Sequence, residues 1–261
     1  MTEASVNVTV RGHVLHIELN RPEKRNAATV EMLQQLALAF GRLDTDPELR
    51  VGVVSAVGDH FTGGLDLADV GAHLGADGLH YVPGGGLDPW AVQTAPVSKP
   101  VVVAVSGICF TLGIELILAA DVAVAAIDTS FAQLEVSRAI LPFGGATLRF
   151  AARCGWGNAM RWMLTGERFD ASEALRIGLV QEVVATGTQV ERALAIAESI
   201  AAQAPLAVQA TLANARLAGR ASEAEAAAAL QPELMCLLAT KDAARGMQAF
   251  MTRTEANYEG N

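Results

Sequence analysis

Apolar and polar residues alternate near the start of the chain. Apolar side chains occupy every second position over 6–10 and again over 15–19, and the residues between them, Arg11-Gly12-His13, are typical of a turn. A period of two is the pattern of a strand with one buried face. These two segments therefore predict a β-hairpin.

The apolar period then changes to that of a helix. Apolar residues follow helical spacing from Met32 to Leu43, and Thr29 stands where a residue could cap that helix. Three short apolar runs, 51–58, 101–107 and 122–126, predict buried strands. Strands that alternate with helices imply crossover connections, so we expect an α/β fold with a parallel sheet covered on both faces.

The second half of the chain becomes purely helical. Asp170 and Glu173 resemble a capping box, and Gly178 is placed to end the short helix that it would open. From about Gln189 the sequence is rich in alanine and helical to near its end. This change predicts a core domain over 1–200 and a C-terminal helical region over 201–261.

Two segments are harder to interpret from the pattern alone. Residues 71–95 contain Gly84-Gly85-Gly86 and no clear period, which is typical of a flexible surface loop. Residues 106–126 form an apolar run almost long enough to cross a bilayer. Because that run contains two acids and several residues that weaken helices, we expect a buried segment and no membrane insertion.

Composition narrows the choice of partner and location. The 261 residues carry a net charge of -9 with the basic residues scattered, which argues against a nucleic-acid partner or an anionic membrane surface. Cys109, Cys154 and Cys236 are widely spaced, and we expect them to be reduced, buried and cytoplasmic. The five histidines show no metal-binding spacing, so no metal site is expected.

Two glutamates stand in apolar surroundings. Glu115 lies within the 106–126 run, and Glu135 is flanked by Leu134 and Val136. One interpretation is structural, a buried carboxylate neutralised by an arginine or by backbone donors. The other is catalytic, because burial raises the pKa of a carboxyl group toward neutrality, and two such groups can give and take a proton.

Glycines follow two of the predicted strands. The segments 61–67 (FTGGLDL) and 110–115 (FTLGIE) could each open a helix with exposed N–H groups. Facing turns of this kind can place two donors on one oxygen and stabilise an enolate or a tetrahedral oxyanion. No GK[ST] sequence follows either turn, which disfavours a phosphate loop, and Ser106 lacks the frame of a nucleophile elbow.

Six segments, in order along nearly the whole chain, resemble the crotonase superfamily of enoyl-CoA hydratases and isomerases. They are LNRPEKRNA (19–27), FTGGLDL (61–67), KPVVVAVSGICFTLGIELILAADVAVA (99–125), ILPFGGATLR (140–149), ALRIGLVQEVV (174–184) and TKDAARGMQAFMTR (240–253). The resemblance implies a crotonase-like spiral of ββα units with a C-terminal helical trimerisation region. It also implies a homotrimer or a dimer of trimers, an acyl-CoA substrate, and no cofactor beyond the coenzyme A of that substrate.

The resemblance also implies roles for particular residues. The backbone N–H groups of Leu65 and Leu112 would form the oxyanion hole. Glu115 would act on water, and Glu135 would act on the α-carbon. The expected reaction is the reversible hydration of trans-2-enoyl-CoA in fatty acid metabolism. The alternatives are an enoyl-CoA isomerase, an acyl-CoA hydrolase, or a catalytically idle acyl-CoA binder.

Further positions would contact the substrate or shape its pocket. Coenzyme A contacts are expected at the segment around FTGGLDL and at its entry; they are Arg25, Gly63, Asp66 and Leu67. Asp66 could instead cap a helix. Phe143 and Gly144 would lie on the loop beside the acyl pocket and the water.

The chain departs from the family pattern inside the expected site. Thr111 and Leu112 replace glycines, and a positive φ at Leu112 would strain it. Phe143 replaces a glycine after the loop proline, where it could reshape or dry the pocket. Trp90, Val97 and Trp162 could line an acyl tunnel, although apolar core residues need no such role.

Overall fold

The computed structural model describes residues 4–261, and its largest sheet has six strands in the order β1-β2-β3-β4-β6-β9. The first two strands form the predicted antiparallel hairpin, and every other pair in this sheet is parallel. The strands are β1 (Val6–Arg11), β2 (Val14–Leu19), β3 (Val51–Ala56), β4 (Val101–Val105), β6 (Val122–Ala126) and β9 (Glu182–Val184). The predicted α/β class and parallel sheet are therefore confirmed.

A second sheet has three strands in the order β5-β7-β8. Its strands are β5 (Ile108–Phe110), β7 (Ser130–Ala132) and β8 (Phe169–Asp170). β5 follows directly after β4, and β7 follows directly after β6, so each turn of the chain adds one strand to each sheet. This repetition of two strands and a helical segment is the spiral of ββα units that the resemblance implied.

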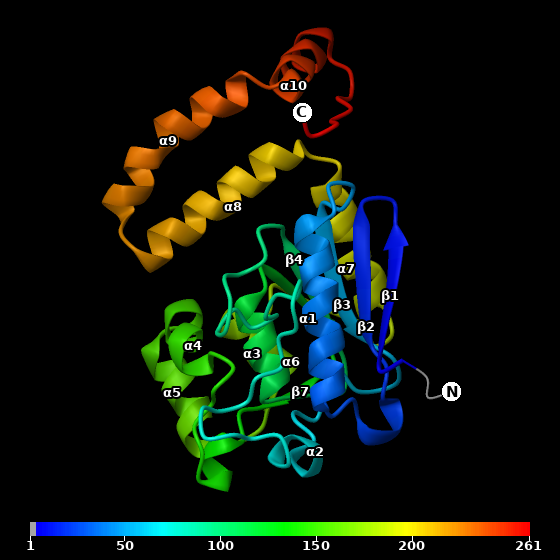
Figure 1. Ribbon diagram of the computed structural model, residues 1–261, viewed down its shortest axis with the longest axis vertical. Helices are drawn as coiled ribbons and strands as arrows, with labels where there is room; N and C mark the ends of the chain where they lie inside the picture. The colour runs from blue at the N-terminus through cyan, green and yellow to red at the C-terminus, as the bar shows by residue number, and fades with distance from the viewer. Residues whose placement is uncertain (1–3) are drawn as a thin grey trace.

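Helices cover both faces of the larger sheet (Figure 1). α1 (Val30–Thr45) buries an apolar stripe on one side, and Thr29 Oγ1 accepts a hydrogen bond from the Met32 N–H at its start, as predicted. On the other side α7 (Gln189–Ala201) packs against Val and Ala side chains of the sheet. Burial of apolar surface on both faces explains why the strands read as continuous apolar runs.

The remaining helices complete the body and extend from it. The body contains η1 (Pro22–Lys24), α2 (Leu67–Gly71), α3 (Leu112–Ala119), η2 (Glu135–Arg138), α4 (Ala146–Cys154), α5 (Trp156–Thr165) and α6 (Ala171–Arg176). The Asp170 carboxylate caps α6 by accepting a hydrogen bond from the Glu173 N–H at 2.8 Å. The extension consists of α8 (Pro205–Arg220), α9 (Glu223–Leu238) and α10 (Lys241–Thr252) (Figure 1).

This extension carries little buried surface of its own. α8 has no buried residue, while Phe250 and Met251 of α10 are 80% and 76% exposed. Cys236 of α9 is also exposed, so the prediction that all three cysteines are buried is wrong for this one. The division of the chain into domains at residue 200 stays a prediction.

The apolar run 106–126 folds as three short elements, β5, α3 and β6, inside the core. Within residues 4–261 no single helix has the length and apolar character needed to cross a membrane. The bent pair of α7 and α8, at 106° to each other, meets that criterion by length and composition only.

Candidate active site

Two glycine-containing turns lie side by side at the ends of the central strands. The Thr62 N–H donates to the Ile108 carbonyl at 3.0 Å, and the Phe110 N–H donates back to the Thr62 carbonyl at 3.0 Å. This pairing joins segments that are more than forty residues apart in the sequence. It brings the turn that ends at Leu65 next to the start of α3 at Leu112.

Each turn presents a backbone N–H that has no acceptor among residues 4–261. Leu112 is the first residue of α3, so its N–H has no intrahelical partner. Within residues 4–261 neither the Leu65 N–H nor the Leu112 N–H makes a hydrogen bond to the protein. Both residues line the same cavity. The structure thus brings together the two residues whose N–H groups were expected to form an oxyanion hole.

Backbone strain at this turn falls on Thr111 and not on Leu112. Thr111 has φ 45° and ψ −106°, a conformation that side chains with a Cβ rarely adopt, whereas Leu112 begins a regular helix. The backbone strain that the sequence suggested for Leu112 therefore lies one residue earlier, at Thr111. Across from Thr111, Gly64 has φ 104°, and a Cβ added there would lie 2.4 Å from Thr111 Oγ1.

Glu115 projects from the first turn of α3 and is 3% exposed. Its Oε1 accepts a hydrogen bond from the Ala146 N–H at 3.1 Å, at the start of α4. A Cβ added at Gly144 would lie 2.5 Å from Glu115 Oε2, so only glycine leaves room for this carboxylate. Burial outweighs the backbone donor and raises the pKa of Glu115 to about 7.

Glu135 begins the short helix η2 after β7 and is 6% exposed. Gln133 Nε2 donates to its Oε1 at 3.1 Å, while its Oε2 is buried and has no partner among residues 4–261. Burial raises the pKa of this carboxyl as well. No arginine pairs with either glutamate in the described part of the chain, which argues against neutralisation by an arginine, and the backbone donor at Glu115 does not prevent its pKa from being raised.

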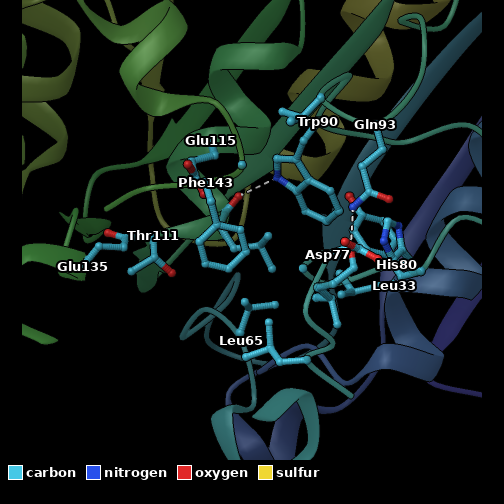
Figure 2. Close-up of a pocket in the computed structure, with 17 residues that line it drawn as sticks. Leu33, Leu65, Asp77, His80, Trp90, Gln93, Thr111, Glu115, Glu135 and Phe143 are labelled. Atoms are coloured by element: carbon cyan, nitrogen blue, oxygen red, sulfur yellow. Dashed lines mark hydrogen bonds between the residues drawn. The ribbon is translucent and has the colours of Figure 1, made fainter. Parts of the chain in front are cut away.

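One cavity of about 360 Å³ contains both carboxylates. Figure 2 shows Phe143 in this cavity between Glu115 and Leu65, with Thr111 and Glu135 to one side and Trp90 to the other. The residues that line the cavity are Leu33, Leu65, Leu74, Asp77, Gly78, Leu79, His80, Tyr81, Trp90, Val92, Gln93, Thr111, Leu112, Glu115, Glu135, Phe143 and Gly144. The lining is mainly apolar, and of its three carboxyl groups Glu115 and Glu135 lie on one side in Figure 2 and Asp77 lies on the other.

The sequence-based picture of a flexible loop over 71–95 is wrong for its second half. Asp88 is 1% exposed, and its carboxylate accepts hydrogen bonds from the Tyr81 hydroxyl and from the N–H groups of Trp90, Val92 and Gln93. These bonds fold the segment into a fixed wall of the cavity. The only signal in the sequence was an Asp between Gly and Pro residues, which by itself indicates no more than a turn.

Trp90 links this wall to the oxyanion turn. Its indole Nε1–H donates to the Leu112 carbonyl at 3.0 Å, which is the dashed line beside Trp90 in Figure 2. On the other side of the wall, Arg149 of α4 donates to the Ala91 carbonyl at 3.0 Å. Of the three residues considered for an acyl tunnel, Trp90 lines the cavity, whereas Val97 and Trp162 do not. Trp162 instead stacks on Phe169 in the core.

The residues expected to hold coenzyme A lie outside the cavity lining, near its Leu65 side. The Gly63 N–H donates to the Arg25 carbonyl at 2.8 Å, so these two residues are neighbours, and Leu67 is 54% exposed. Asp66 pairs with Arg21 at 2.8 Å, which lowers the pKa of Asp66 and gives its carboxylate a structural role. Asp66 occupies the N-cap position of α2, but its side chain makes no capping hydrogen bond.

A spiral of ββα units with two buried glutamates beside two free N–H groups defines a crotonase-type protein. The family model for enoyl-CoA hydratase/isomerase matches residues 9–261. This chain belongs to the enoyl-CoA hydratase/isomerase family, whose members act on acyl-CoA thioesters.

Known relatives cover nearly all of the chain. The enoyl-CoA hydratase EchA19 of Mycobacterium tuberculosis is 30% identical over 95% of this chain and 94% of its own length. The (E)-benzylidenesuccinyl-CoA hydratase of Thauera aromatica is 32% identical over 98% of this chain and 99% of its own length. The crystal structure of a probable enoyl-CoA hydratase/isomerase from Mycobacterium abscessus matches with a TM-score of 0.96 and 53% identity, covering 98% of this chain and 99% of that one.

Proposed function

We propose that this chain catalyses the reversible addition of water to trans-2-enoyl-CoA thioesters to give 3-hydroxyacyl-CoA. The observation that carries the proposal is the pair of buried carboxyl groups, Glu115 and Glu135, in one cavity with the free N–H groups of Leu65 and Leu112. An isomerase needs one proton-transfer group that acts on carbon. A second buried carboxyl has a use when water must be activated as well.

The proposed reaction starts with the thioester oxygen held by the Leu65 and Leu112 N–H groups. The ionised Glu115 carboxylate takes a proton from water, and the water oxygen bonds to C3 of the enoyl group. The electrons of the double bond move toward the thioester oxygen, which becomes an enolate oxygen stabilised by the two donors. Glu135, protonated beforehand, then delivers its proton to C2. The proton that Glu115 took from water finally passes to Glu135, which restores the starting state of both groups.

The surroundings of the two carboxyl groups support these roles. The Ala146 N–H points at Glu115 Oε1, and a backbone donor favours the ionised form that a base needs. Glu135 Oε2 has no donor beside it in residues 4–261, so this oxygen can carry a proton. Burial raises the pKa of Glu115 to about 7, so Glu115 can hold or release a proton near neutral pH, and burial raises the pKa of Glu135 as well.

We further propose that coenzyme A lies across Arg25, Gly63 and Leu67. The exposed Arg25 guanidinium forms no ion pair within residues 4–261, so it is available to a phosphate of the substrate. No resident cofactor takes part in this scheme. The location we propose is the cytoplasm, where the free thiols of Cys109, Cys154 and Cys236 would stay reduced.

The test of the proposed reaction is hydration of a short and a long trans-2-enoyl-CoA by the purified protein. We expect loss of the enoyl absorbance and a product whose mass is greater by one water. A product of unchanged mass would show isomerisation, and release of free coenzyme A would show hydrolysis. Either outcome, or binding without any product, would contradict the hydratase proposal. The better chain length would define how much of the 360 Å³ cavity the acyl group fills.

We also propose that the extension of α8, α9 and α10 joins copies of this chain into a trimer or a dimer of trimers. Its exposed apolar residues include Leu230, Leu234, Met235, Leu238, Met247, Phe250 and Met251. Large exposed apolar patches mark association surfaces. Sedimentation should therefore give three or six times the mass of 27.3 kDa, and Phe250→Asp should shift the protein toward monomer. A wild-type monomer would contradict this proposal.

A further inference from the structure

Thr111 is held in a backbone conformation that favours glycine. Its φ of 45° and ψ of −106° place a β-branched residue where almost any side chain is strained. Strain of this kind persists at sites where the side chain has a use that outweighs its cost in stability. A glycine here would keep the Leu112 N–H in place without strain. The threonine side chain itself therefore needs an explanation.

The hydroxyl of Thr111 lies between the two oxyanion turns. Thr111 lines the cavity together with Leu65 and Leu112. Its Oγ1 sits against Gly64, so close that a Cβ on that residue would be 2.4 Å away. Gly64 immediately precedes Leu65, and Thr111 immediately precedes Leu112, so the hydroxyl borders both N–H donors. Figure 2 shows the Thr111 side chain at the edge of the cavity.

This hydroxyl has no partner within the described chain. The Thr111 N–H donates to the Ala132 carbonyl and its carbonyl accepts from the Glu115 N–H, but Oγ1 makes no hydrogen bond among residues 4–261. The other threonine at this site differs, because Thr62 Oγ1 donates to the Asn26 carbonyl at 2.7 Å. Thr111 thus offers a free O–H donor inside the cavity.

We infer that the Thr111 hydroxyl donates a third hydrogen bond to the thioester oxygen, beside those from the Leu65 and Leu112 N–H groups. This inference rests on the proposed hydration reaction. This hydrogen bond strengthens as negative charge builds on the thioester oxygen. The hydroxyl keeps its proton throughout, so the step needs no additional acid or base. Such a contact acts mainly in the transition state, where it increases kcat.

Kinetics of two substitutions separate the hydroxyl from the shape of the side chain. Thr111→Val keeps the volume, the branching and the strain, and removes only the O–H. It should lower kcat by roughly 10- to 100-fold with little change in KM, because a donor used in the transition state has been lost. Thr111→Ser should recover most of that loss. Thr45→Val is the control, because it makes the same change at the last residue of α1, away from the cavity, and it should leave kcat unchanged.

The pH profile tests whether the hydroxyl acts on the thioester or through a carboxyl group. Thr111→Val should leave the pH dependence of kcat/KM where it is in the wild type, because Glu115 and Glu135 keep their surroundings. A shifted profile would mean that Thr111 acts by positioning a glutamate, and would overturn the assignment. A kcat equal to that of the wild type would overturn it too.

A spectroscopic measurement keeps this inference independent of turnover. Butyryl-CoA has no double bond to hydrate, so its thioester C=O stretch can be followed by infrared difference spectroscopy even in a protein that hydrates nothing. The bound C=O band should shift to lower frequency in the wild type and shift less in Thr111→Val. An identical shift in both would overturn the third donor. If the wild type hydrates nothing but its C=O band still shifts further than that of Thr111→Val, only the hydratase proposal is contradicted.

Thr111→Gly completes the comparison. It removes the strain and the hydroxyl together, so it should raise Tm by roughly 2–4 °C while it lowers kcat as far as Thr111→Val does. A Tm below that of the wild type would show that the threonine is retained for stability, which would contradict its assignment as a substrate contact.

Discussion

Replacing Glu115 with Gln should lower kcat for enoyl-CoA hydration by about 10²- to 10⁴-fold, the usual contribution of a positioned acid or base. Glutamine keeps the size of the side chain and can still accept the hydrogen bond from the Ala146 N–H, so the cavity keeps its shape. What it lacks is the capacity to take a proton from water. Initial rates at saturating trans-2-enoyl-CoA measure this loss directly. A Glu115→Gln enzyme with more than a tenth of the wild-type kcat would contradict the role of Glu115 as base.

Glu135→Gln should remove hydration to a similar extent but for a different reason. Glu135 exchanges a proton with C2, a step that does not involve the attacking water. Exchange of the α-hydrogen of butyryl-CoA with D₂O, followed by NMR, should therefore survive in Glu115→Gln and be lost in Glu135→Gln. The opposite pattern would show that the two carboxyl groups have exchanged roles.

Stability supplies the control that separates lost chemistry from lost structure. The pKa of Glu115 is raised from 4.5 to about 7, so the folded protein prefers its neutral form. The contribution of neutral Glu115 to the free energy of unfolding is fully present below pH 4.5, and it is lost as the pH rises through about 7. Ionisation of this buried group costs roughly 3 kcal/mol of the free energy of unfolding.

Glu115→Gln should therefore be more stable than the wild type at pH 8, by up to about 3 kcal/mol, and much closer to it at pH 5. Urea unfolding at the two pH values measures the difference. An inactive variant with higher stability cannot owe its inactivity to misfolding. Equal stability at pH 8 would mean that the Glu115 carboxylate is better solvated than its burial indicates.

The sequence was most informative where local pattern determines structure. The hairpin, α1 with its Thr29 cap, and the parallel strands follow from the spacing of apolar residues, because burial on one or two faces leaves a fixed period. The two glutamates stood out for a similar reason, since a charged residue inside an apolar run conflicts with its surroundings. Their meeting in one cavity depends on the spiral, which the resemblance supplied and the spacing alone could not.

Features that depend on long-range contacts were not predictable. The positive φ at Thr111 occurs where two distant turns pair, and the residue types at 111 and 112 do not by themselves tell which of the two takes it. The exposure of Cys236 depends on how the C-terminal helices leave the body. The wall around Asp88 is held together by backbone N–H groups that donate to a side chain and not by an apolar period, so its sequence pattern predicts only a flexible surface loop.

Removing the Asp88 carboxylate should be among the most destabilising single changes in this protein. Asp88→Ala leaves a buried Tyr81 hydroxyl and three backbone N–H groups without their acceptor. Each unsatisfied buried group costs about 1–3 kcal/mol, and some of them will find water once the loop opens. We therefore expect a loss of at least roughly 3 kcal/mol in the free energy of unfolding, measured by urea denaturation.

Asp88→Ala should also lower kcat, because it frees Trp90. Without Asp88 the Trp90 N–H loses its acceptor, and the indole that donates to the Leu112 carbonyl is no longer fixed. Under conditions where Asp88→Ala is folded, its kcat should fall because the oxyanion turn is less well positioned. Trp90→Phe, which keeps a ring in the wall but removes the indole donor, should lower kcat by less and leave most of the stability intact.

A matched control is Asp44→Ala. Asp44 also accepts hydrogen bonds from a loop, at the Ser98 N–H and hydroxyl, but it does so near the surface and away from the cavity. Its loss should cost no more than about 1 kcal/mol and leave kcat unchanged. If Asp88→Ala were as mild as Asp44→Ala, the carboxylate would not be what holds residues 79–94 against the cavity. The fixed position of Trp90 would then have to come from packing against Tyr81, whose ring centroid lies 6.1 Å away.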